Sequence, residues 1–119
     1  MGANLRNTFY VVSQKSDVWN SSDGINWNLV TNTAPFGARY QHGCLSFDGK
    51  LWVIGGQDPI HPSNAVWYTV NGTDWTRAVE HADFHDIQQH GCVVFDNKMW
   101  VMGGAAYYIG YVDDVWWSN

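Results

Sequence analysis

The chain has 119 residues, with 45% hydrophobic and 14% charged side chains and a formal net charge of −5. This length suits a single domain and no apolar run is long enough to cross a bilayer, which excludes a multidomain enzyme and a membrane span. The six Lys and Arg residues are scattered singly. Nucleic-acid binding is therefore not expected, because phosphate neutralisation needs clustered cations.

The first strand is expected at residues 8–12, as a degenerate strand in which Tyr10 corresponds to Trp52 of the repeat described below. The segment before Asp17 has no apolar stretch of signal-peptide length and no small-residue cleavage site, so it is not a signal peptide as it stands. A secreted parent that has lost its signal is an alternative. The compartment is therefore left open, with an extracellular or periplasmic location favoured over a cytoplasmic one.

Alternation and turn residues predict further short strands, joined as hairpins. In chain order these are 18–22 and 26–30, turned by Asp23-Gly24; 41–47 and 50–54, turned by Asp48-Gly49; and the counterparts of both hairpins further along, turned by Asn71-Gly72 and Asp96-Asn97. These turns are expected to be two to three residues long, because their residues tolerate positive φ. No apolar stripe of helical period is sustained, and eight Trp with twelve Gly fit an all-β protein.

A repeat of 48 residues organises the chain. Between 17–56 and 65–104, 17 of the 40 aligned positions are identical without a gap. A third, incomplete copy begins at Asp114 after one inserted residue. Each repeat holds four short strands. We call the strands of the 41–47 and 50–54 hairpin and of its counterpart a and b, and those of the 18–22 and 26–30 hairpin and of its counterpart c and d. Four antiparallel strands at this period are typical of a β-propeller blade.

The repeat also resembles a known family. A double glycine, Gly55-Gly56, follows strand b, and Tyr68 and Trp75 follow with six residues between them. This pattern resembles the kelch repeat, and Gly103-Gly104 continues it 48 residues further along the chain. The resemblance implies a propeller fold. It says little about activity, because kelch propellers include protein-interaction modules, a copper oxidase and a sugar mutarotase.

The strand count predicts about two and a half blades. We expect a degenerate leading strand in 1–16, strands c and d of a partial blade in 17–40, a full kelch blade in 41–78, and strands a, b and c of another partial blade in 79–119. These ten strands do not close a ring. The predicted fold class is thus all-β, with four-stranded propeller blades in an incomplete ring, belonging either to a longer propeller or to a homo-oligomeric ring.

Functional residues are expected on the connections from b to c and from d to a. These connections are long and irregular, whereas the a to b and c to d turns are short. Long loops on a rigid scaffold commonly carry function. The candidate ligand-binding residues on this loop face are Arg39, His61, His85, Asp86, Tyr107, Tyr108 and Tyr111. The segment from His81 to Asp86 offers imidazole and carboxylate groups, which we weigh as a metal site against a solvated polar loop, favouring the loop.

Other repeated residues are expected to serve the scaffold, because their neighbours repeat with them. They are Trp27, His42, Trp52, Gly55, Gly56, Trp75, His90, Trp100, Gly103 and Gly104. The Trp side chains would pack between blades, and the imidazoles would satisfy buried backbone groups. Cys44 and Cys92 lie in equivalent columns outside any Cys-x-x-Cys spacing, so we expect buried free thiols. The segment 21–27 resembles a shortened Asp-box hairpin of sialidases, which is a structural turn.

The favoured function is a non-catalytic binding module that takes a protein or a glycan on its loop face. We expect no cofactor, no bound metal, no nucleic acid and no membrane span. One alternative is a carbohydrate-active enzyme of the kelch copper oxidase or sugar mutarotase type. Another is a structural protein whose chains associate into a ring or fibre through exposed strands.

Overall fold

The structure is a computed structural model, and it describes residues 2–13, 15–39, 41–57, 63–106 and 109–118. Within these ranges the chain forms strands and turns without a helix. The strands are β1 (Gly2–Leu5), β2 (Thr8–Val12), β3 (Val18–Ser21), β4 (Asn28–Thr31), β5 (Gly43–Phe47), β6 (Lys50–Ile54), β7 (Val66–Thr69), β8 (Trp75–Val79), β9 (Ile87–Gln88), β10 (Gly91–Phe95), β11 (Lys98–Met102), β12 (Ala105–Ala106), β13 (Gly110–Tyr111) and β14 (Val115–Trp117).

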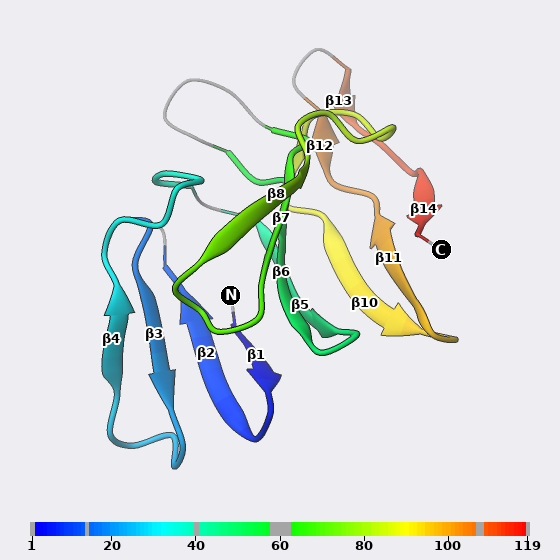
Figure 1. Cartoon of the computed structure of the whole chain (residues 1–119). Helices are drawn as coiled ribbons and strands as arrows, with labels where there is room; N and C mark the ends of the chain where they lie inside the picture. The colour runs from blue at the N-terminus through cyan, green and yellow to red at the C-terminus, as the bar shows by residue number, and fades with distance from the viewer. Residues whose placement is uncertain (1, 14, 40, 58–62, 107–108, 119) are drawn as a thin grey trace.

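Three antiparallel sheets form the body of the molecule. The first sheet is β1-β2-β3-β4, the second is β5-β6-β7-β8, and the third is β10-β11-β14. They fan out side by side in chain order, and β5 lies between β1 and β10 (Figure 1). This arrangement confirms the predicted all-β fold of propeller blades in an incomplete ring.

The first sheet has a strand that the sequence analysis did not predict. We expected one strand in residues 1–16, but β1 and β2 form a hairpin there, with Ala3 opposite Tyr10. Its segment Gly-Ala-Asn-Leu lacks β-branched and aromatic residues, so local propensity gives no strand signal. Pairing with β2 and burial of Leu5 in the core stabilise it instead. The three sheets thus contain eleven strands rather than ten.

The turns also differ in length from the prediction. The a to b turns have two residues each, with positive φ at Asp48 and Gly49 in the second sheet. The c to d connections are longer than the expected two to three residues, because they span 22–27 and 70–74. Side chains organise them: in the first, the Asp23 carboxylate accepts hydrogen bonds from the backbone N–H groups of Ile25 and Asn26, both at 2.8 Å. These bonds hold the pKa of Asp23 well below its ordinary value.

The cores lie between the sheets. We call the side of each sheet that faces the next sheet its forward face, and the opposite side its rear face. Tyr10 and Val12 on the forward face of the first sheet pack against Leu51 and Val53 on the rear face of the second, in one buried cluster. A second cluster, which includes Ile54 and Val101, joins the forward face of the second sheet to the third. Each interface therefore uses equivalent columns of the repeat.

The two end faces of the stack expose the columns that are buried inside it. On the forward face of the third sheet, Phe95 is 69% exposed, whereas its counterpart Phe47 is half-buried. On the rear face of the first sheet, Phe9 is exposed, whereas its counterpart Leu51 is fully buried. The stack therefore ends in two apolar surfaces that correspond to the two sides of its own internal interfaces.

Candidate binding face

Long connections cluster at one end of the sheets, opposite the short hairpin turns (Figure 1). Three short strands in these connections form a small sheet in the order β13-β12-β9. The backbone N–H of Gly56 donates to Ile87 O at 2.9 Å, and the N–H of Ile87 donates to Ser63 O at 3.2 Å. The described part of the d to a loop before the third sheet is thus bonded to described residues of the b to c connections on either side of it.

Asn64 fixes the segment that contains the His and Asp residues. Its Nδ2 donates to the carbonyl oxygens of Ala82 and Phe84 at 3.0 and 3.1 Å, and its Oδ1 accepts from His81 Nδ1 at 3.1 Å. This amide clamp was not foreseen from the sequence, because nothing local marks Asn64. Within the described ranges, no three His, Cys, Asp or Glu side chains come together as metal ligands.

Several predicted ligand-binding residues are exposed on this face. His85 and Asp86 are exposed on the loop from β8 to β9, and Tyr111 of β13 is 87% exposed. Ile109, which the sequence analysis did not single out, is exposed beside Gly110 in the same connection. Other predicted residues of this face, His61, Tyr107 and Tyr108, lie outside the described residues.

Arg39 is placed differently from its predicted position at the surface. Its side chain is only 5% exposed, and the guanidinium donates to Gly55 O at 2.8 Å and to Phe36 O at 3.1 Å. The guanidinium carbon also lies 5.8 Å from the centre of the Phe36 ring. Arg39 therefore ties the d to a loop to the end of β6, beneath the loop face.

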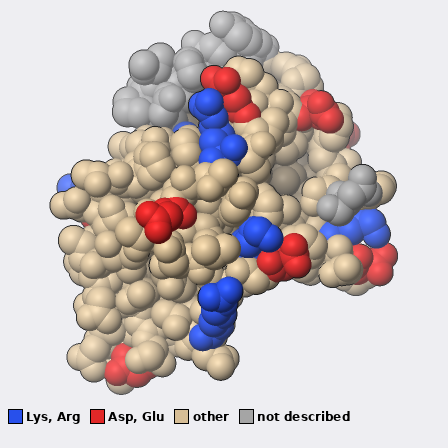
Figure 2. All heavy atoms as spheres, viewed as in Figure 1, with Lys and Arg blue, Asp and Glu red and all other residues tan. Residues whose placement is uncertain are grey.

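Charges are interspersed over the described surface. Lys50 pairs with Asp48 at 3.4 Å and Lys98 with Asp96 at 3.7 Å, each within its own hairpin. Figure 2 shows Lys and Arg at separate positions on the viewed face, without a broad patch of either sign. In the part of the chain that the structure describes, no helix is long and apolar enough to cross a membrane.

Comparison with known proteins agrees with this geometry. The kelch motif matches residues 38–68, which cover most of β5, β6 and β7 with the loop before them. This segment is a kelch motif. The solved structure of YjhT superposes with a TM-score of 0.74 at 22% sequence identity, over 89% of this chain and 34% of YjhT. The chain thus spans about a third of that protein's length, and no curated protein matches it in sequence.

The two repeated imidazoles bridge neighbouring sheets. His42 Nε2 donates to Val12 O at 3.1 Å, and His90 Nε2 donates to Ile54 O at 3.0 Å. Val12 and Ile54 are the last residues of β2 and β6, so each bond joins one sheet to the next. Burial lowers the pKa of His42 to about 4 and also lowers the pKa of His90.

The repeated tryptophans bond within their own hairpins. Nε1 of Trp52 donates to Phe47 O at 3.0 Å, and Nε1 of Trp75 donates to Gly72 O at 3.0 Å. Trp100 and Trp27 make the equivalent bonds at 2.8 and 3.2 Å. Their rings differ in burial, because Trp27 lies on the exposed end of the stack.

The two cysteines, Cys44 and Cys92, are free thiols. Cys44 is buried between the first and second sheets, and Cys92 is half-buried between the second and third. Burial raises the pKa of both thiols to about 12. Both therefore stay protonated at neutral pH and behave as small apolar side chains.

Proposed function

We propose that the chain is a non-catalytic binding module whose loop face docks a protein partner. The observation that carries this proposal is the exposure of Tyr111 on a three-stranded platform, β13-β12-β9, held by backbone hydrogen bonds. Tyr is enriched in protein interfaces because it supplies a large, rigid contact area with a polar tip. A rigid scaffold beneath such a residue lowers the entropy lost on binding.

The side chains beside Tyr111 favour a protein over a glycan. Ile109 is 59% exposed in the same connection. A branched aliphatic side chain gains from apolar burial in a protein interface but provides no flat ring on which a sugar can stack. His85 and Asp86 add polar groups that suit the rim of such an interface.

The test uses peptides selected by phage display against the whole chain, together with a glycan array. Selected peptides should bind with affinities that fall about tenfold or more in Tyr111→Ala, because an aromatic anchor commonly dominates an interface. Val94→Ala is the matched control, since Val94 is exposed in β10, away from the loops. Thermal melts should show both variants folded.

Equal peptide affinity in wild type and Tyr111→Ala would refute the loop face as the site. Glycan binding that depends on Tyr111, without peptide binding, would replace the protein partner by a sugar. Unfolding of Tyr111→Ala would show that this tyrosine serves the fold instead.

The exposed end faces favour a second candidate function, assembly of identical chains. The forward face of the third sheet and the rear face of the first present the two sides of an interface that the chain already forms internally. Head-to-tail association of this kind gives a ring if the rotation closes and a filament if it does not. Light scattering after gel filtration should then give a mass above that of one chain, and Phe95→Asp should return the monomer. A monomer at every concentration would exclude assembly.

A further inference from the structure

The turn between β7 and β8 contains an Asn-Gly pair, Asn71-Gly72, and none of the other asparagines of the sequence precedes a glycine. In such a pair the backbone nitrogen of the glycine can attack the side-chain amide carbon of the asparagine, because glycine has no side chain to hinder the approach. Asparagine is a thermolabile residue. Asn71 is therefore the asparagine of this chain that is best placed to lose its side-chain amide.

The folded turn blocks this attack, because both reacting groups are bonded elsewhere. The N–H of Gly72 donates to Thr69 Oγ1 at 2.9 Å, and Thr69 is fully buried. Asn71 Oδ1 accepts from the N–H groups of Thr73 and Asp74 at 2.9 and 2.8 Å. Asn71 Nδ2 donates to Asp74 Oδ2 at 2.8 Å. These bonds must break before the Gly72 nitrogen can reach the Asn71 side-chain carbon.

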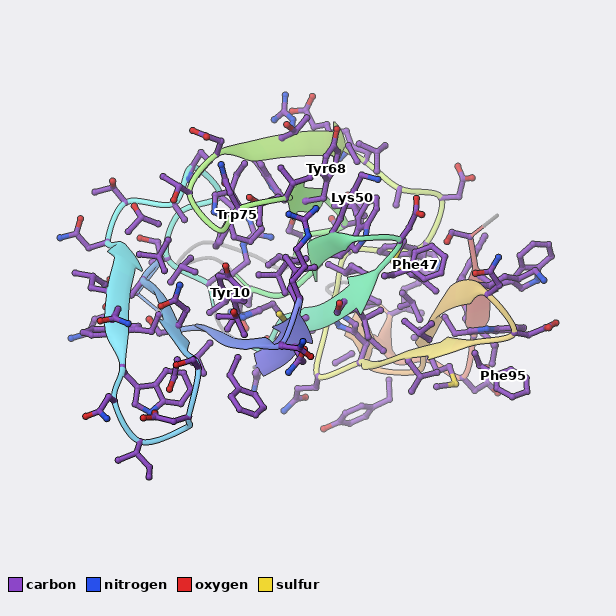
Figure 3. All side chains as sticks on the ribbon, turned by 60° about the horizontal axis from the view of Figure 1, so that its bottom comes forward. Tyr10, Phe47, Lys50, Tyr68, Trp75 and Phe95 are labelled. Carbon is purple, nitrogen blue, oxygen red and sulfur yellow. The ribbon has the colours of Figure 1, made fainter. Side chains whose placement is uncertain are left out.

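Packing between the first and second sheets also holds the turn closed. A Cβ added to Gly72 would lie 2.6 Å from Cε1 of Tyr10. Trp75, at the start of β8, packs edge-on against Phe36, with ring centres 4.9 Å apart. Figure 3 shows Trp75 and Tyr10 together between these sheets. The turn therefore opens only when this part of the interface opens with it.

The equivalent turn of the first sheet shows what an acid at this position requires. One repeat earlier, Asp23 stands in the position of Asn71. Asn26 stands in the position of Asp74, and its Nδ2 donates to Asp23 Oδ2 at 2.9 Å. Both turns thus pair one carboxylate with one amide, with the two groups exchanged. An acid at position 71 would face the carboxylate of Asp74 without an amide donor.

We propose that Asn71 is a site of spontaneous deamidation that the folded turn holds back, and that the products cannot rebuild the turn. When the turn opens, the Gly72 nitrogen bonds to the Asn71 side-chain carbon, and the side-chain nitrogen leaves as ammonia with the proton of the Gly72 N–H. One water molecule then opens the cyclic imide at either of its two carbonyl groups. One opening gives aspartate, and the other gives isoaspartate, whose backbone runs through the former side chain.

Both products oppose closure of the turn. Aspartate places two like charges where Asn71 Nδ2 and Asp74 Oδ2 are 2.8 Å apart. Isoaspartate adds one carbon to the backbone of a turn in which Gly72 has no free space beside Tyr10. In a modified chain the β7-β8 hairpin is therefore open more often, and so is its contact with the first sheet. Modified molecules accumulate with the time that the turn has spent open.

The reaction is followed by incubating the full chain in heavy-oxygen water at mildly alkaline pH, in native buffer and in urea. Peptide mapping by mass spectrometry measures the heavy oxygen incorporated at residue 71. The rate in native buffer should be about tenfold or more below the rate in urea, which is the ratio for an opening that costs more than about 1.4 kcal/mol.

A variant of the turn tests the gating. Thr69→Val keeps the branched shape of a buried side chain but removes the hydroxyl that binds the Gly72 N–H. It should raise the rate in native buffer about fivefold or more and leave the rate in urea unchanged. Thr76→Val is the matched control, because Thr76 is exposed in β8, and it should keep both wild-type rates.

A double-mutant cycle tests the effect of the product on stability, measured by urea denaturation. Asn71→Asp should lower the ratio of folded to unfolded chain about threefold or more, and less so at high salt because both side chains are exposed. Adding Asp74→Asn restores the acid and amide pair of the first turn and should recover most of the loss. Asp74→Asn alone should have a smaller effect than Asn71→Asp. Asn26→Asp, which pairs two acids in the first turn, should behave like Asn71→Asp.

The proposal is overturned if residue 71 takes up no heavy oxygen in urea, or takes it up equally fast in native buffer. It is overturned too if Asn71→Asp is as stable as wild type, or if Asp74→Asn does not rescue it, since the product would then fit the turn. Should Thr69→Val fail to fold, urea below the unfolding transition replaces it. The wild-type rate should then rise with urea concentration, and a constant rate would refute the gating.

Discussion

Stability should fall with acid between about pH 6.5 and pH 4 because His42 is buried in its neutral form. The side chain is 4% exposed, and its Nε2–H bonds to Val12 O. Burial, together with nearby positive charge including that of Arg39, lowers the pKa of His42 from 6.5 to about 4. In this window the unfolded chain binds a proton that the folded chain does not. The contribution of neutral His42 to the free energy of unfolding is therefore fully present above about pH 6.5, and it is lost as the pH falls toward 4.

The magnitude follows from the two pKa values. At about pH 5, a shift from 6.5 to about 4 corresponds to a loss of about 2 kcal/mol relative to neutral pH. The substitution His42→Gln retains an N–H donor but cannot titrate. Its free energy of unfolding should be lower than wild type at neutral pH, because packing is lost. Between about pH 7.5 and about pH 5, however, the variant should lose about 2 kcal/mol less than wild type.

Urea denaturation followed by tryptophan fluorescence at the two pH values measures this difference directly. His85→Gln is the matched control, because His85 is exposed, and it should keep the wild-type pH response. The reasoning fails if His42→Gln and wild type lose the same stability between the two pH values, since the imidazole could not then be held neutral by burial.

Gly24 and Gly72 both have positive φ, but only the Gly72 Cβ position meets another side chain, so Gly24→Ala should cost about 1 to 2 kcal/mol and Gly72→Ala clearly more by urea denaturation. Equal costs would contradict the close approach. Leu51→Ala should cost about 2 to 5 kcal/mol, whereas Phe9→Ala, in the same column on the exposed end, should cost far less. In thermal melts, Asp23→Ala should lower the midpoint and Asp23→Asn should largely restore it, because an amide oxygen can accept the same backbone bonds.

The candidate site was only partly predictable from the sequence. The long loops were assigned to one end of the sheets from chain order and turn length, and His85, Asp86 and Tyr111 are exposed there. Arg39 was misplaced because a charged side chain is normally solvated, and only the folded chain brings the carbonyls of Phe36 and Gly55 to its guanidinium. The Asn64 clamp joins groups 18 and 20 residues apart, which no local pattern reveals.

The sequence by itself determined the blades. Strand alternation, turn residues with positive φ and the 48-residue repeat are local properties, and they specify hairpins whether or not the sheets pack. Tertiary structure decided the rest. β1 exists because β2 pairs with it and Leu5 is buried, and equivalent columns such as those of Leu51 and Phe9 differ in exposure only through their place in the stack. The burial of a residue depends on whether another sheet packs against its face. A repeated sequence does not show which of its copies has such a neighbour.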